Sequence, residues 1–229
     1  MKLGESKQIY YFSSEGRKNM EKTVELVSQR AEKLGINNIV VFTANGDGAF
    51  LLKKKLSLSS NIKVHAATFP YKQVFYGKDK DGNRIENMAE TSTPEIRMRL
   101  KEEEINIIQG VMPLQDIFIP GAKDVKTLTI HHTLSLISGG LRLCVQGILM
   151  AVDGGHIESG EYVIAMSADT AIVAKSCLSS LLFHPSEGLE ISEIICKPNR
   201  LTITHTQQNL GQTRLLTNGN FKLTDFGWI

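Results

Sequence analysis

The chain has 229 residues, of which 41% are hydrophobic, so it can bury a sizeable core in one large domain or two small ones. Its 26 basic and 24 acidic residues leave a formal charge of only +2, which excludes the strongly basic composition typical of a nucleic-acid-binding protein. The first eight residues are polar and charged and contain no apolar signal core, so we expect no secretion and a cytoplasmic location.

The first part of the chain alternates strands and helices. An apolar run over 9–12 predicts a strand. Asn19 is a candidate cap for the following helix, whose apolar residues recur at helical spacing, and Gly35 is expected to end it. A strand over 39–43, a helix over 49–56 and a strand over 62–67 then form a βαβ unit, which favours a parallel sheet.

The most informative stretch is the glycine-containing turn between the strand over 39–43 and the helix that follows it. The two glycines allow the backbone to approach an anion closely, and the first N–H groups of the helix have no intrahelical partner and lie at the positive end of its dipole. The turn is therefore a candidate phosphate site. Its candidate binding residues are Thr43, Ala44, Asn45, Gly46, Asp47, Gly48 and Ala49.

This turn does not match the standard nucleotide-binding motifs. A dinucleotide fingerprint requires glycine where this chain has Leu51. A Walker motif requires lysine followed by serine or threonine, whereas Lys53, Lys54 and Lys55 fall one to two turns into the helix. The alternative that stays open is a connection with favourable turn chemistry and no ligand.

The middle of the chain contains a polar segment. Residues 71–93 predict a mobile surface insertion with a solvated turn or hairpin tip. Pro94 begins a helix that is expected to continue to about residue 104, and a short strand over 105–108 follows, before a loop over 111–123. The aspartates of the insertion do not match the spacing of an EF-hand.

Helix is expected again from about residue 125, with a pause at Gly139-Gly140. The apolar region over 134–152 predicts a core helix rather than a membrane span, because it contains Arg142 and Gln146. The cysteines are too far apart for a zinc site and are odd in number, so we predict buried free thiols and no metal site. They are Cys144, Cys177 and Cys196.

The last part of the chain is rich in strand patterns. Runs over 162–166 and 170–174 are separated by only three residues, so they form either a hairpin or one kinked strand. A further core strand is expected over 191–196. We predict that 199–229 is a C-terminal appendage, either β structure or a contact through which the chain forms a homo-oligomer.

The order of these pieces resembles the stand-alone proteins related to the C-terminal α/β domain of pyruvate kinase. The resemblance extends over about residues 9–198. It implies an α/β fold, a three-layer α/β/α sandwich with a mainly parallel central sheet, in a domain 1–198 that contains the insertion 71–93. The residues that carry it are Tyr11-Phe12 with Gly16 and Asn19, the stretch 39–49, Leu143-Cys144-Val145 with 150–155, and 162–165 with 168–171 and 191–198.

The resemblance also implies a ligand. In pyruvate kinase the turn matching Thr43 to Gly48 cradles a phosphate of a sugar bisphosphate effector, and some stand-alone relatives resemble carriers of flavin mononucleotide (FMN). The chain is therefore expected to bind a phosphorylated small molecule, with FMN as the leading candidate, through 43–49, Asp169 and Thr170. The Asp47 carboxylate must point away from the phosphate, because like charges repel. We expect Gly46→Val to abolish binding while the fold survives.

Two departures from the family leave an alternative open. The glycine-rich loop before Ala168 is reduced here to Met166 and Ser167, and 109–113 replaces a turn that contains Ser and His in relatives. Either change could remove flavin binding, which would leave a non-catalytic phosphometabolite sensor or an oligomeric scaffold. No pyruvate kinase activity is implied, because the barrel that carries its catalytic residues has no counterpart, and the catalytic residues of any other reaction remain unknown.

Overall fold

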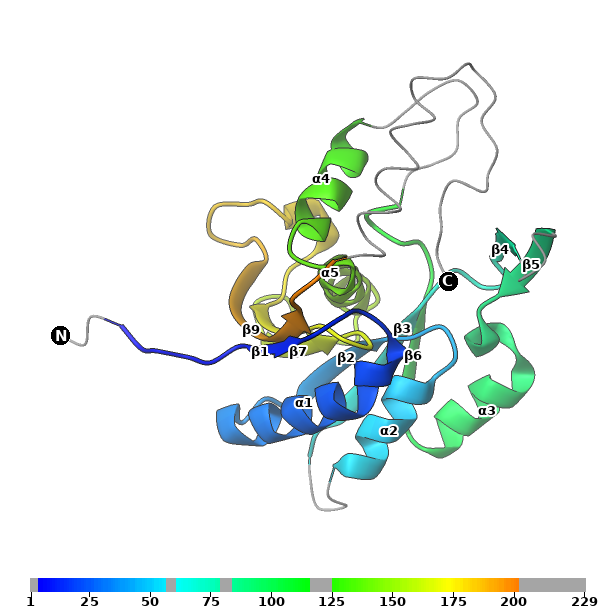
Figure 1. The fold of residues 1–229 in the computed structure, drawn as a ribbon, viewed down its shortest axis with the longest axis horizontal. Helices are drawn as coiled ribbons and strands as arrows, with labels where there is room; N and C mark the ends of the chain where they lie inside the picture. The colour runs from blue at the N-terminus through cyan, green and yellow to red at the C-terminus, as the bar shows by residue number, and fades with distance from the viewer. Residues whose placement is uncertain (1–3, 57–60, 79–83, 116–124, 202–229) are drawn as a thin grey trace.

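The computed structural model describes residues 4–56, 61–78, 84–115 and 125–201 (Figure 1). The helices are α1 (Met20–Leu34), α2 (Asp47–Lys55), α3 (Pro94–Glu102), α4 (Val125–Ser135) and α5 (Gly139–Asp153). The strands are β1 (Tyr10–Phe12), β2 (Asn38–Phe42), β3 (Lys63–Thr68), β4 (Val74–Lys78), β5 (Arg84–Met88), β6 (Asn106–Gln109), β7 (Tyr162–Met166), β8 (Ala171–Lys175) and β9 (Glu190–Pro198). Short 3-10 turns cover Arg17–Asn19, Glu90–Ser92 and Ser179–Leu181.

The main sheet of the described chain has the strand order β1-β9-β8-β7-β2-β3-β6. All neighbouring pairs are parallel except the two that involve β8, which runs against the other strands. The carboxyl ends of the parallel strands therefore lie at one edge of the sheet, where ligands bind in open α/β sheets. The hairpin of β4 and β5 forms a separate small sheet.

Helices cover both faces of the main sheet (Figure 1). Helices α1, α2 and α3 lie on one face, and α5 lies on the other with α4 packed against it. The predicted three-layer α/β/α architecture with a mainly parallel sheet is confirmed. Because strands covered on both faces have no solvent side, they are apolar throughout rather than alternating, as in the run Ile39-Val40-Val41-Phe42.

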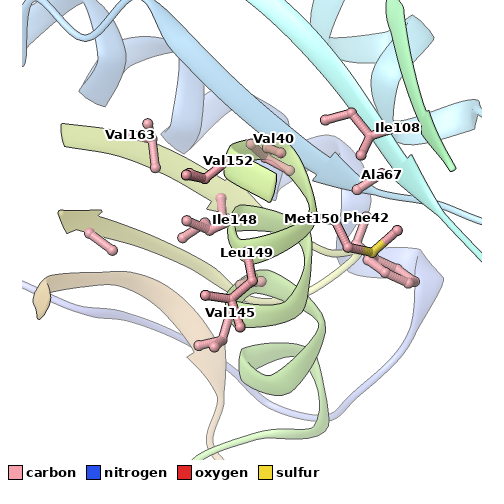
Figure 2. Close-up of a cluster of buried hydrophobic side chains, with 14 of the residues drawn as sticks. Val40, Phe42, Ala67, Ile108, Val145, Ile148, Leu149, Met150, Val152 and Val163 are labelled. Atoms are coloured by element: carbon pink, nitrogen blue, oxygen red, sulfur yellow. The ribbon is translucent and has the colours of Figure 1, made fainter. Parts of the chain in front are cut away.

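Helix α5 is the centre of one of the two apolar clusters in the core (Figure 2). Its residues Val145, Ile148 and Leu149 are almost fully buried. Gly147 faces the sheet, where a Cβ atom would lie 3.0 Å from Cγ1 of Val40, so the absence of a side chain allows the helix to approach β2 closely. The predicted core helix over 134–152 is confirmed for the part that forms α5.

Helix α1 ends as the sequence predicts, but it does not begin in the predicted way. Gly35 adopts the left-handed conformation, with φ 64°, and the N–H of Ile36 donates to the carbonyl of Ala31 at 3.0 Å. Asn19 stands at the N-cap position, but its side-chain amide donates to the carbonyl of Ser14 at 2.7 Å and does not cap a helix amide. The predicted role of Asn19 is therefore wrong, because a 3-10 turn already leads into the helix.

The segment 71–93 is more closely attached to the body than the sequence predicts. Strands β4 and β5 form an antiparallel hairpin, whose tip at 79–83 lies outside the described residues. After the hairpin, Ala89, Thr91 and Ser92 are buried. The N–H of Thr91 donates to the carbonyl of Ala44 at 3.0 Å. The end of this segment therefore supports the turn that follows β2 and is not a solvated insertion.

The open question about 162–174 is resolved as a hairpin. Strands β7 and β8 pair in antiparallel register from Tyr162 with Lys175 to Met166 with Ala171. The N–H of Ser167 donates to the carbonyl of Thr170 at 2.8 Å and closes the turn. The predicted appendage lies outside the described residues beyond Arg200 and Leu201.

Candidate functional site

The turn between β2 and α2 is held by its own side chains. The hydroxyl oxygen of Thr43 accepts a hydrogen bond from the N–H of Gly46 at 2.9 Å. The side-chain oxygen of Asn45 accepts from the N–H of Asp47 at 3.2 Å. Thr43 and Asn45 therefore satisfy turn amides, as serine, threonine and asparagine commonly do in such turns.

Gly46 is required by the shape of this turn. It is the N-cap of α2 and has φ 87°, a conformation that L side chains rarely adopt. A Cβ atom at this position would lie 2.7 Å from Cε2 of Phe50. Gly46→Val would therefore strain the turn itself. A loss of binding in this variant would not separate the ligand contact from the strained turn, so another variant must test the site.

The first turn of α2 contains amide groups that have no acceptor within the helix. The N–H of Phe50 donates to the carbonyl of Gly46 at 3.0 Å and is the first bond of the helix. Helix geometry gives the preceding amides of Gly48 and Ala49 no intrahelical acceptor, and both residues are buried. Ala44 is exposed at the mouth of the turn.

Asp47 already brings a negative charge to this helix terminus. Its carboxylate accepts a hydrogen bond from the side-chain amide of Asn45 at 3.1 Å and forms an ion pair with Arg17. The Arg17 side chain is 67% exposed. An acidic residue in the first turn of a helix is favourable because of the helix dipole. The turn therefore contains a charge pair that faces solvent.

Asp169 and Thr170 lie in the β7–β8 turn and are committed to internal bonds. The Asp169 carboxylate accepts from the N–H of Gly16 at 2.8 Å and from the hydroxyl of Thr170 at 3.0 Å. The Thr170 hydroxyl oxygen also lies 3.0 Å from that of Ser138 at the start of α5. Burial raises the pKa of the Asp169 carboxyl above its ordinary value. Thr170 is fully buried, so its polar atoms are not exposed at the surface.

The structure nevertheless connects the two groups of predicted site residues. Asp169 holds the backbone of Gly16, and the next residue, Arg17, pairs with Asp47 in the β2–α2 turn. The hydroxyl of Thr23 in α1 also donates to the carbonyl of Ala168 at 3.1 Å. Asp169 therefore positions the loop after β1, and this loop supplies the cation of the site.

Arg17 is the residue that sequence reasoning missed. The only sequence signal is a glycine and an arginine directly after a strand and before a helix, in Ser13-Ser14-Glu15-Gly16-Arg17. That pattern is common in surface loops. What makes Arg17 relevant is its ion pair with Asp47, which the sequence cannot give.

Two open pockets lie elsewhere on the described surface. One, of about 550 Å³, is at the amino ends of the strands and includes Asn38, Lys63 and Glu161 in its lining. The other, of about 440 Å³, is at the carboxyl edge beyond β3 and is lined by residues that include Tyr71 and Arg97. Neither is lined by residues 43–49.

The three cysteine thiols are buried. Burial raises the pKa of the Cys144 thiol well above its ordinary range and that of Cys196 to about 12, and it raises the pKa of Cys177 as well. The predicted buried free thiols are confirmed. His65 is buried in β3, between Asn38 and Asn106, as expected of a core histidine. Within the described ranges, no group of three His, Cys, Asp or Glu residues is placed to hold a metal ion.

No family model matches this chain. Solved structures that resemble it include pyruvate kinase from Cryptosporidium parvum in complex with ADP, with 14% identity, a TM-score of 0.33 and coverage of 77% of this chain and 23% of that one. A second structure of the same enzyme has 15% identity, a TM-score of 0.33 and coverage of 67% and 22%. This chain thus spans less than a quarter of the length of these enzymes. The neighbours come from the enzyme family named by the sequence resemblance, at low identity and partial coverage.

None of the helices in the described chain combines the length and the apolar character that a membrane span requires.

Proposed function

We propose that this chain binds a phosphate-bearing small molecule at residues 43–49, with FMN as the leading candidate. The observation that carries the proposal is the ion pair of Arg17 with Asp47, which brings an exposed cation from the loop before α1 to the first turn of α2. The amides of Gly48 and Ala49 in that turn have no acceptor within the helix. Arginine and helix N-termini are both suited to phosphate oxygens.

The carboxylate of Asp47 sets the condition for binding. It is paired with Arg17, so a phosphate must either share the guanidinium with this carboxylate or displace it. Because like charges repel, the Asp47 side chain has to turn toward solvent when the ligand binds. Its partial exposure gives it room to do so. We therefore infer a modest affinity that falls as the salt concentration rises.

The first test is a visible absorbance spectrum of freshly purified protein, with mass spectrometry of any small molecule released on denaturation. Flavin bands with a stoichiometric FMN mass would support the proposal. If the protein is colourless, titration with FMN and with riboflavin separates the phosphate from the ring, because the two molecules differ only by the phosphate group. FMN should raise the melting temperature and riboflavin should not.

Arg17→Gln tests whether FMN binds at the β2–α2 turn. It removes the charge from an exposed side chain and leaves the backbone of the turn unchanged. FMN affinity should fall about tenfold, as expected for the loss of one charge-assisted contact. The control is Lys18→Gln, which removes a neighbouring positive charge with no contact to Asp47 recorded in the described structure. Equal FMN affinity in all three proteins would contradict the site. A phosphosugar that stabilises the protein in place of FMN would favour the sensor alternative.

A further inference from the structure

A second pocket lies at the carboxyl edge of the sheet, beside β6. Its volume is about 440 Å³, and it is lined by Tyr71, Arg97, Ile107, Gln109 and Gly110. Tyr71 belongs to the turn after β3, Arg97 to α3, and the other three to β6 and its end. In Figure 1 α3 and the β4–β5 hairpin lie on the side of the molecule away from β1.

Gln109 fixes the polar wall of this pocket. Its side-chain nitrogen donates to the carbonyl of Phe69 at 2.9 Å and to the hydroxyl oxygen of Ser92 at 3.3 Å. This orientation leaves its side-chain oxygen to accept a hydrogen bond from the Arg97 guanidinium at 2.5 Å. The guanidinium is therefore held by a neutral amide, which orients its charge without neutralising it.

Two cations converge on one exposed aromatic ring. Cζ of Arg97 lies 5.5 Å from the ring centroid of Tyr71, and Nζ of Lys72 lies 5.4 Å from the same centroid. Within the described ranges, neither cation forms an ion pair with a carboxylate. The Tyr71 side chain is 56% exposed. Arg97 and Tyr71 thus line the pocket, and Lys72 lies beside it over the same ring.

Lys72 occupies a backbone position that suits glycine. The N–H of Gln73 donates to the carbonyl of Pro70 at 3.0 Å and closes a tight turn in which Lys72 has φ 56°. A positive φ at this turn position favours glycine or asparagine, so a lysine there is unfavourable for the backbone. The turn alone does not require the lysine, so the charge is the property that it adds at this position.

We propose that this pocket binds a small planar aromatic acid. The ring of the ligand packs against Tyr71, and its carboxylate or phosphate group lies between Lys72 and Arg97. Cations that are oriented but not neutralised, next to an aromatic surface, provide the complementary chemistry for such a ligand. The site is separate from the turn 43–49, and the proposal does not depend on phosphate binding there.

The test uses the full-length protein labelled with nitrogen-15 and follows the backbone amides of Lys72 and Gly110 during titration. Benzoate and phenyl phosphate are the probes that carry both a ring and a charge. Benzyl alcohol has the ring without the charge, and acetate and inorganic phosphate have the charge without the ring. Benzoate or phenyl phosphate should shift the resonances of both amides in a saturable manner. The probe that binds more tightly shows whether the site prefers a carboxylate or a phosphate group. The three partial probes should bind at least tenfold more weakly.

Lys72→Gly separates binding from stability. The variant should keep or raise the melting temperature, because glycine suits φ 56°, while affinity for the better probe falls about tenfold. Arg97→Gln should weaken binding to a similar extent. Lys101→Gln, an exposed position on the same helix, is the control and should leave affinity unchanged. The proposal is overturned if neither probe shifts the two amides, if acetate binds as tightly as benzoate, or if Lys72→Gly binds as tightly as the parent protein.

Discussion

The carboxylate of Asp169 accepts a hydrogen bond at 2.8 Å from the backbone N–H of Gly16, which lies 153 positions earlier in the chain. The bond connects the β7–β8 turn to the loop between β1 and α1. The second carboxylate oxygen accepts from the hydroxyl of Thr170. Asp169 thus satisfies two donors in a site that is nearly closed to water.

Asp169→Ala should lower the free energy of unfolding by about 1–3 kcal/mol, because the N–H of Gly16 and the hydroxyl of Thr170 both lose their acceptor. Asp169→Asn should cost less, since it keeps one acceptor oxygen and removes a charge whose burial is unfavourable. Urea denaturation of the three proteins measures both effects. Equal stability of the alanine variant and the parent would contradict the role of Asp169 as a connection.

His65 should make stability depend on pH. Burial lowers its pKa to about 4 from an ordinary value of 6.5. The unfolded chain therefore binds a proton at a higher pH than the folded protein does. The contribution of His65 to the free energy of unfolding is constant above about pH 6.5, and stability is lost as the pH falls from 6.5 to 4. The full loss is about 3 kcal/mol, and the decrease ends below pH 4.

The measurement is urea denaturation across this pH range for the parent and for His65→Gln. The variant should show a smaller decrease, because it lacks the buried imidazole of β3. Some pH dependence should remain, since burial also lowers the pKa of His131 to about 4. The exposed residue His184 serves as the control, and His184→Gln should retain the decrease of the parent. A decrease of the same size in His65→Gln would show that His65 does not cause it.

Asp47→Asn should strengthen phosphate binding at the β2–α2 turn. The substitution removes the carboxylate that pairs with Arg17 and would repel a phosphate. We expect a several-fold increase in FMN affinity, together with a loss of up to about 1 kcal/mol of stability from the helix dipole. FMN titration and thermal unfolding of the same samples measure the two effects. Weaker FMN binding would mean that Asp47 contributes to the ligand site rather than opposing it.

The carboxyl ends of α1 and α3 provide a matched pair for a backbone prediction. Gly35 and Glu104 occupy the same left-handed position after their helices, with φ 64° and 54°. Glu104→Gly should stabilise the protein by about 0.5–1 kcal/mol, and Gly35→Ala should destabilise it by a similar amount. Glu104 is 86% exposed and lies 3.6 Å from Lys53, an ion pair that contributes little. Thermal unfolding that shifts both variants in the same direction would contradict this assignment.

Gly140 in α5 lies against the β7–β8 turn. A Cβ atom there would lie 2.4 Å from Oγ of Ser167 and 2.7 Å from Cβ of Thr170. Gly140→Ala should therefore destabilise the protein by about 1–3 kcal/mol, although alanine is the better helix former. Gly110→Ala, where no other atoms lie within 4 Å, is the control for denaturation measurements. Unchanged stability of Gly140→Ala would indicate that the turn can move away from α5.

The alternation of strands and helices was predictable because buried parallel strands and amphipathic helices leave strong patterns in sequence. The apolar run before Thr43 predicted a buried strand, and Gly35 predicted the end of the first helix. The turn geometry between β7 and β8 was not predictable, since a connection of three residues permits either a hairpin or one kinked strand. The pairing with β9 is required to hold β8 in place, and that pairing is a property of the tertiary structure.

The contacts around the candidate sites depend on residues far apart in the chain, which explains why sequence reasoning found only part of them. The bond between Asp169 and Gly16 and the ion pair of Arg17 leave no local pattern. Lys72 is a different case. Turn rules place glycine or asparagine at a positive φ, so a lysine there gives a misleading signal.

Strand β1 has its partner at the far end of the sequence, since Tyr10 pairs with Cys196 and Phe12 with Pro198. During synthesis on the ribosome, the β1 segment therefore waits without a strand partner until β9 has emerged. Such non-local pairing slows folding and leaves an unpaired edge exposed to other chains in the meantime. A nascent chain that stalls before Glu190 would contain the β2–α2 turn but could not dock the loop after β1 against a completed sheet.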